Sequence, residues 1–206
     1  MSAATPNSIT LKVSRFIDSL DDLARKHDRA AMSNLRNSLS SAPNAEILAD
    51  EYVAPHAVDV GPRYAKAMYV VAGLYGRWRG ARTSDDWSTH KGLRFGEAMR
   101  IVMTGESNNV KETSKITFRR ICNSDPEQLR AHLQQAVSRC SSRNIFLDWA
   151  SLVHDIAKWG EGPFDVTDER SEHPSRKWAR DFWNVPNGNI PAADTGTTPE
   201  NGDHLK

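Results

Sequence analysis

The sequence predicts an all-α protein, a single-chain bundle of about eight or nine helices. Along most of the chain, apolar residues recur at intervals of three and four, which places them on one face of successive helices. No stretch sustains the alternation of apolar and polar residues, rich in β-branched and aromatic types, that is typical of a strand. Residues that favour helix starts, such as Asp125 followed by Pro126, separate the periodic segments.

The first helices are predicted from an apolar stripe and a cap. An amphipathic helix is expected over about residues 9–27. Its stripe consists of Val13, Phe16, Ile17, Leu20, Leu23 and Ala24. Asp28 has a side chain suited to cap a second helix, with Met32, Leu35 and Leu39 facing inward. A short third helix is expected after Asn44.

Residues 61–105 are expected to form two helices separated by a loop. Pro62 fits the first turn of a helix that continues to about Tyr75. The segment 76–92, GRWRGARTSDDWSTHKG, is rich in glycine and polar residues and is predicted to be a loop. The next helix ends near Gly105. Its inward residues are Phe95, Met99, Val102 and Met103.

A helix is expected over about 110–122, and the one after it has the clearest start in the chain. Asp125 stands at its N-cap, Pro126 at its first position and Gln128 at its third, which is a capping-box arrangement. The residues expected to face inward are Leu129, Leu133, Ala136, Val137 and Cys140.

The end of the chain predicts two more helices and a tail. Asp148 is expected to cap a helix that Gly160 ends, and the segment SRKWARDFW forms the last helix. Residues 185–206 contain three prolines, three glycines and few apolar side chains, so a disordered tail is predicted. We expect one helical domain over 1–184, with an N-terminal part over about 9–105 and a C-terminal bundle over about 108–184.

Composition narrows the class of protein. Hydrophobic residues make up 38% of the 206 residues and charged residues 26%, which is typical of a soluble globular protein. No apolar run approaches 18 residues and no hydrophobic signal segment is evident, so we expect a cytoplasmic protein with no membrane partner. Cys122 and Cys140 lack zinc-site spacing and are expected to be free thiols. The sequence predicts no metal and no cofactor.

The net charge of +1 conceals a basic centre. Residues 63–143 hold 15 Lys and Arg against 7 Asp and Glu, a net charge of +8. Residues 1–62 carry −2 and residues 144–206 carry −5. This distribution indicates a nucleic-acid-binding surface in the centre of the chain, although a solvated basic face has the same composition.

One basic cluster precedes Cys122. Lys111, Lys115 and Arg119 are spaced by four residues, and Arg120 lies beside them. Like charges at this spacing destabilise a helix by roughly 0.2–0.5 kcal/mol per pair, so the ridge favours a bound anion. The alternative is that acidic neighbours such as Glu112 neutralise it.

A second basic cluster is GRWRGAR, with Arg77, Arg79 and Arg82 around Trp78. Arginine binds phosphate through its planar fork, and an exposed tryptophan can stack on a base. The alternative is a helix C-terminus, where cations interact favourably with the dipole and Trp78 belongs to the core. Both interpretations stay open. Further scattered arginines suit sequence-independent contact with a nucleic-acid backbone: Arg36, Arg63, Arg94, Arg100, Arg130, Arg139 and Arg143.

The adjacent His154 and Asp155 raise the possibility of a metal-dependent phosphohydrolase of the HD type. At 100° per residue, the buried stripe of this helix is Trp149, Leu152, Val153 and Ile156. His154 then points about 150° away from the stripe and Asp155 about 110° away, so both are predicted to face solvent. A metal site in a bundle needs ligands that face the core. We therefore expect no catalytic residues and no enzyme.

Two segments near the C-terminus stand out, FLDWASLVHDIAKWGEG and RKWARDFW. Upstream, in order, are LRNSL, GPRYAKAMYVVAGLY, RFGEAM and DPEQLRAHLQQAV. Together these segments resemble the CasB family, the small subunit of the type I-E CRISPR Cascade complex. The resemblance covers about residues 10–184.

The resemblance implies an all-helical, non-enzymatic subunit that is present in two copies and contacts the backbone and large subunits of Cascade. It also implies contact with guide RNA and with target and non-target DNA, and a role in holding the displaced strand of the R-loop. A helix-turn-helix regulator remains an alternative. This chain has Glu97 and Thr117 at two positions where the family carries arginine.

The resemblance implies nucleic-acid contacts at Arg36, Arg63, Arg119, Arg120 and Arg130. With the two basic clusters and the neighbouring arginines, the expected interface is Arg36, Arg63, Arg77, Arg79, Arg82, Lys111, Lys115, Arg119, Arg120, Arg130, Arg139 and Arg143.

Overall fold

The computed structural model describes residues 6–80, 92–104, 110–159 and 172–184, and these residues are helical almost throughout. The elements are α1 Pro6–Arg25, α2 Arg29–Asn37, the 3₁₀ helix η1 Ala45–Ala49, α3 Asp50–Ala57, α4 Pro62–Gly80, α5 Phe95–Thr104, α6 Glu112–Cys122, α7 Pro126–Ser142, α8 Trp149–Trp159 and α9 Pro174–Asn184. Within these ranges the β-structure is a single parallel bridge between Leu93 and Leu147. The all-α prediction is confirmed.

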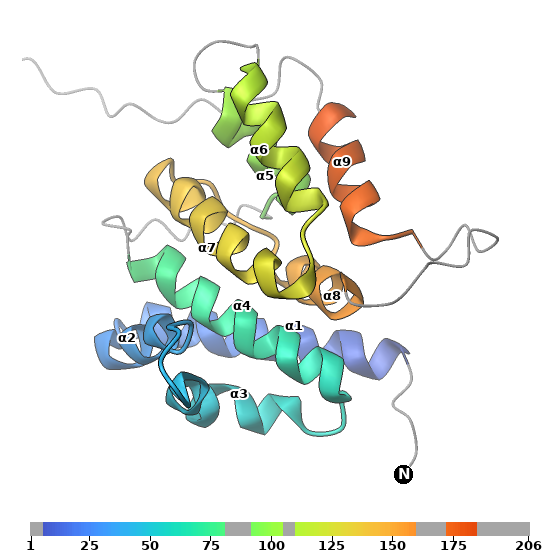
Figure 1. Ribbon diagram of the computed structural model, residues 1–206. Coiled ribbons are helices and arrows are strands. Elements are labelled where there is room, and N and C mark those ends of the chain that lie inside the picture. The colour runs from blue at the N-terminus through green and yellow to red at the C-terminus, as the bar shows by residue number, and fades with distance from the viewer. Residues whose placement is uncertain (1–5, 81–91, 105–109, 160–171, 185–206) are drawn as a thin grey trace, which may run out of the picture.

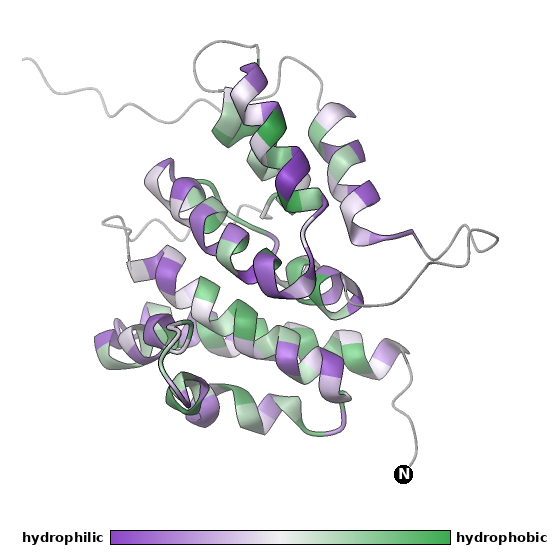
Figure 2. Ribbon diagram, in the orientation of Figure 1, coloured by the Kyte–Doolittle hydropathy of each residue, from purple (hydrophilic) through white to green (hydrophobic). Residues whose placement is uncertain are grey.

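The helices form three groups (Figure 1). Helices α1 to α4 lie together, α7 and α8 form a middle layer, and α5, α6 and α9 lie beyond it. Helix α4 is the central element, because it packs on α2, α3, α7 and α8. Each helix carries both hydrophilic and hydrophobic residues (Figure 2), as expected for amphipathic helices around a common core.

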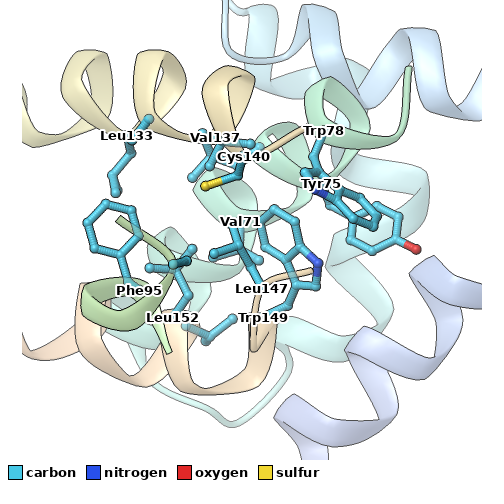
Figure 3. Close-up of a cluster of buried hydrophobic side chains, with 14 of the residues drawn as sticks. Val71, Tyr75, Trp78, Phe95, Leu133, Val137, Cys140, Leu147, Trp149 and Leu152 are labelled. Atoms are coloured by element: carbon cyan, nitrogen blue, oxygen red, sulfur yellow. The ribbon is translucent and has the colours of Figure 1, made fainter. Parts of the chain in front are cut away.

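One hydrophobic core connects the groups. Side chains from α4, α5, α7 and α8 converge in Figure 3, among them Val71, Phe95, Leu133 and Leu152. Helix α5 belongs to the N-terminal part predicted from the sequence, yet it packs mainly on α9 and also on α7. The division of the chain near residue 105 stays a prediction.

The predicted loop over 76–92 is wrong for its first five residues, which form the last turns of α4. Gly76 lies in the crossing of α4 over α2, where an added Cβ would stand 2.8 Å from the Arg36 nitrogen. Trp78 is only 2% exposed, and its Nε1 donates to the Ile145 carbonyl at 2.9 Å. Tertiary packing thus maintains a helix through glycines that indicate a loop in the sequence alone.

The predicted helix starts are confirmed by their caps. Asp28 accepts a hydrogen bond from the Ala31 amide, Asp125 from the amides of residues 127 and 128, and Asp148 from the Ser151 amide. The inward residues predicted for α7 are all buried. The predicted stop at Gly160 and the predicted tail over 185–206 lie outside the described residues.

Candidate nucleic-acid interface

The short turn between α6 and α7 creates an open groove of about 370 Å³, which we call the α6–α7 groove. Its lining residues are Ile116, Arg119, Arg120, Asn123, Gln128 and His132. Asn123 caps the end of α6, and Asp125 begins α7 after a single intervening residue. The predicted Arg119 and Arg120 therefore lie together, with two amide side chains and an imidazole beside them.

The ridge on α6 is only partly neutralised by its own helix. Glu112 lies 3.0 Å from the Lys115 ammonium and 3.9 Å from the Arg119 guanidinium. Arg119 and Glu112 are both largely exposed, so their pair contributes at most about 1 kcal/mol. Arg120 and Lys111 are exposed and form no ion pair with any described residue. The neutralisation considered from the sequence thus reaches two of the four cations.

A second group of cations lies where α4, α7 and α8 meet. Arg63 and Lys66 of α4 and Arg130 of α7 line one groove of about 280 Å³, which we call the α4–α7–α8 groove. Arg130 is held in place, because its Nη2 donates to the Ser38 carbonyl at 3.1 Å and its Nη1 lies 3.5 Å from Glu46. Lys66 was missed in the sequence, although its position three residues after Arg63 places it on the same helix face.

The described part of the GRWRGAR cluster, residues 76–80, is the end of α4. Trp78 belongs to the core, which excludes it as an exposed stacking platform. The half-buried Arg77 donates through Nε to the Ser138 hydroxyl at 2.6 Å and ties α4 to α7. Arg79 is half-buried as well, near the deeply buried Tyr75, whose pKa is raised by burial and by the charge of Asp21. The helix-terminus interpretation is the one that fits this geometry.

The other predicted basic residues lie apart from the two grooves. Arg36 is exposed on α2 and its Nη1 lies beside Gly80. Arg139 and Arg143 are exposed at the end of α7. None of these three side chains forms an ion pair with a described residue. Arg82 lies outside the described residues.

The two positions at which the resemblance implies an arginine that this chain lacks both carry side chains with local hydrogen bonds. Glu97 accepts a hydrogen bond from the Arg94 amide at 2.9 Å, so it caps the start of α5. Thr117 donates to the Thr113 carbonyl within α6. At both positions the side chain completes helix hydrogen bonding.

The prediction that His154 and Asp155 face solvent is wrong. Asp155 is 6% exposed and accepts hydrogen bonds from Trp178 Nε1 at 2.7 Å and Lys177 Nζ at 2.9 Å. His154 is half-buried, with its Nδ1 3.1 Å from the Tyr64 hydroxyl. The angle of a side chain around its own helix does not show which other helices pack beside it. Here α9 covers Asp155 and α4 covers His154.

The hydrogen-bond partners of the half-buried His154 and the buried Asp155 are side chains of the fold itself. Both carboxylate oxygens of Asp155 already accept hydrogen bonds from α9. Among the residues the structure describes, no group of three or more His, Cys, Asp or Glu side chains is placed to hold a metal ion. The two cysteines form no disulfide, and burial raises the pKa of each thiol to about 12. Neither thiol is therefore ionised near neutral pH.

A family model matches residues 29–183, which is most of the described chain, and its description is CRISPR-associated protein Cse2. The chain belongs to the Cse2 family. The resemblance to the CasB small subunit found in the sequence is confirmed. A search of curated proteins found no match.

Solved structures of Cse2 and CasB proteins share the fold. The Cse2-family protein TTHB189 from Thermus thermophilus is 26% identical, with a TM-score of 0.60 over 84% of this chain and 98% of that chain. CasB from Thermobifida fusca is 17% identical, with a TM-score of 0.59 over 84% and 97%. A chain from a CRISPR RNA-guided surveillance complex is 18% identical, with a TM-score of 0.61 over 85% and 92%.

None of the described helices of this Cse2 protein combines the length and the hydropathy of a transmembrane span.

Proposed function

We propose that this chain is the non-catalytic small subunit of a type I-E Cascade complex, and that its α6–α7 groove binds the backbone of the displaced DNA strand. The observation that carries the proposal is that Arg119 and Arg120 have little acidic neutralisation from described residues. They share one groove, and within the described residues only a weak, exposed contact with Glu112 offsets their charge. An anion from outside the chain, such as a DNA phosphate, neutralises the remaining positive charge of the two arginines.

The groove suits a phosphate backbone for physical reasons. Guanidinium groups present a planar fork of donors that matches phosphate geometry, and exposed arginines reach it with little desolvation cost. R-loop formation is close to energetically balanced, so modest contacts with the displaced strand are enough to favour the open state. The groove need not read sequence to perform this role, because guide RNA does so.

The expected partners follow from the same role. They are the backbone and large subunits of Cascade, a second copy of this chain, guide RNA, and the target and non-target DNA strands, all in the cytoplasm. Support comes from family membership and from the fold shared with a chain of a surveillance complex. The helix-turn-helix alternative predicts sequence-selective duplex binding by the isolated chain, whereas this proposal predicts weak and non-selective binding.

The test replaces Arg119 and Arg120 together with glutamate in the assembled complex. The affinity for a DNA target that forms an R-loop should fall about tenfold or more, because two backbone contacts become repulsive. The matched control is Arg15→Glu with Lys26→Glu, which makes the same charge change at exposed sites on and just after α1. Equal affinities for wild type, variant and control would contradict the proposal.

A further inference from the structure

The α4–α7–α8 groove differs from the α6–α7 groove in its floor. Apart from Arg63, Lys66 and Arg130, its lining is apolar and comes from α4, α7 and α8. Pro126 is exposed and Val70 and Ile156 are partly exposed, so these three side chains form its accessible walls. Its three charged lining residues are all cations, and no carboxylate is among its lining residues.

We propose that this groove is a base subsite, in which one unstacked base of a single strand enters the apolar pocket while its flanking phosphates contact the cations at the rim. The inference rests on the proposed function, because it assigns a second contact to the same nucleic acid. In this proposal Arg63, Lys66 and Arg130 contact the phosphates, and the apolar walls contact the base.

The two parts of the groove select for a ligand with two kinds of group. The apolar interior excludes phosphates and charged side chains, because an ionised group loses its hydration there without gaining partners. The cations at the rim attract negative charge just outside. A nucleic-acid strand repeats this pattern at every nucleotide, with a flat uncharged base between two phosphates. The volume of about 280 Å³ lies at the small end of ligand sites, which suits a single base.

The position of the groove favours a nucleic acid over an acidic protein segment. Gln128 and His132 of α7 line the α6–α7 groove, while Leu129 and Leu133 of the same helix line this one. The two grooves therefore flank the first half of α7 and are separated by one helix diameter, roughly 10 Å. A strand bound in the first groove reaches the second by crossing one helix, so the same polyanion fits both.

Acidic groups lie near this face. Asp125 caps α7 and accepts from two backbone amides, so the positive end of that helix offsets its charge. Glu127 is exposed on the first turn of α7, and Glu46 lies 3.5 Å from Arg130. Arg63 and Lys66 reach the groove from α4.

The test compares two single-stranded DNA oligonucleotides of equal length, one with bases and one abasic throughout. Binding to the full-length chain is followed by fluorescence anisotropy at several salt concentrations. The wild-type chain should bind the strand with bases about fivefold to tenfold more tightly, because only that strand fills the pocket. The salt dependence of the two affinities should be the same, since both strands carry the same phosphates.

Two variants separate the pocket from its rim. Val70→Phe, which fills the groove, should abolish the preference for bases and leave binding of the abasic strand unchanged. Its control is Val58→Phe, at an exposed valine outside the groove, which should keep the preference. Lys66→Ala should weaken both strands equally and reduce the salt slope by about 0.7. If circular dichroism shows that Val70→Phe has lost helix, the same measurements are made on Ile156→Phe, which fills the groove from α8.

The outcomes distinguish this proposal from the one on which it rests. Equal wild-type affinities for the two strands, with a clear salt slope, would overturn the base subsite and leave backbone binding intact. No binding of either strand at low salt would overturn both. A third outcome uses an acidic peptide that contains one leucine as a competitor of DNA binding. If the peptide competes with the wild-type chain but not with Val70→Phe, and the wild type binds the two strands equally, the groove binds a protein partner and the base subsite is overturned.

Discussion

The buried Asp155 and the exposed Arg119–Arg120 pair are both charged groups of the C-terminal half, but the structure treats them in opposite ways. Asp155 lies between α8 and α9, and both of its oxygens accept hydrogen bonds from α9. Arg119 and Arg120 lie in an open groove, where the 3.9 Å contact between Arg119 and Glu112 is the single ion pair that either arginine forms with a described residue.

This contrast separates structural from functional charge in this chain. A buried charge whose hydrogen-bonding capacity is filled from inside contributes to the fold, and its removal exposes the partners it leaves behind. An exposed charge without such partners contributes little to the fold, and its role lies in what it attracts from outside. The adjacent His154 and Asp155 raise the possibility of a metal site and were predicted to face solvent, but the structure gives both of them internal partners.

The largest expected effect is the loss of stability on replacing Asp155 with leucine. Trp178 Nε1 would lose its buried acceptor and Lys177 its ion pair, so the free energy of unfolding should fall by about 2–4 kcal/mol. Urea denaturation measures this change. Asp155→Asn, which retains an acceptor oxygen without the charge, should lose less.

The metal-dependent phosphohydrolase alternative makes a contrary prediction for the same site. It requires that Mn²⁺ raises the melting temperature of the wild-type protein and that a chelator lowers it, both through Asp155. Because both oxygens of Asp155 accept internal hydrogen bonds, we expect no shift of the melting temperature with either Mn²⁺ or the chelator.

A smaller effect is expected on the pH dependence of stability when His154 is replaced with glutamine. Burial and the positive charge of Lys158 lower the pKa of His154. The unfolded chain therefore takes up a proton before the folded chain does, and stability falls as pH drops from about 6.5 through the folded-state pKa. Glutamine binds no proton and can still hydrogen-bond Tyr64, so its decline in stability with falling pH should be shallower.

Denaturation curves measured at a series of pH values test this prediction. His56 and His173, whose pKa values burial also lowers, are present in both proteins and contribute equally to each curve. A variant curve parallel to that of the wild type over this range would show that His154 is not held neutral by the fold.

The smallest effect on stability is expected for Arg119→Gln with Arg120→Gln. These changes remove one weak exposed ion pair and some favourable interaction with the end of the α6 dipole, so the free energy of unfolding should change by less than about 0.5 kcal/mol. Thermal unfolding beside the Asp155 variants measures the contrast. A loss as large as that of Asp155→Leu would show that the arginines belong to the fold.

Local signals made much of the fold predictable. The start of α7 was predicted because its cap, its proline and its apolar period lie within one short segment. The helical end of α4 was not, because Gly76 indicates a loop until α2 is packed against it. The burial of Asp155 depends on Trp178, which lies 23 residues further along the chain.

The candidate site was predictable only in part, for the same physical reason. Arg119 and Arg120 are neighbours in the chain, so their cluster was visible in the sequence. The meeting of Arg63 with Arg130 in one groove depends on the crossing of α4 and α7, which local patterns do not encode. Lys66 became a candidate only when that groove was known.

Exposed cations of this chain, above all Arg119 and Arg120, are expected to bind a nucleic-acid backbone. The most direct measurement is the affinity of the full-length chain for single-stranded DNA as a function of salt concentration, for the wild type and for Arg119→Glu with Arg120→Glu. With about four phosphates contacted, the wild-type slope of log affinity against log salt should be near −3, at roughly −0.7 per contact. The variant slope should be flatter by about 1.4 or more. Equal slopes and equal affinities would contradict the account.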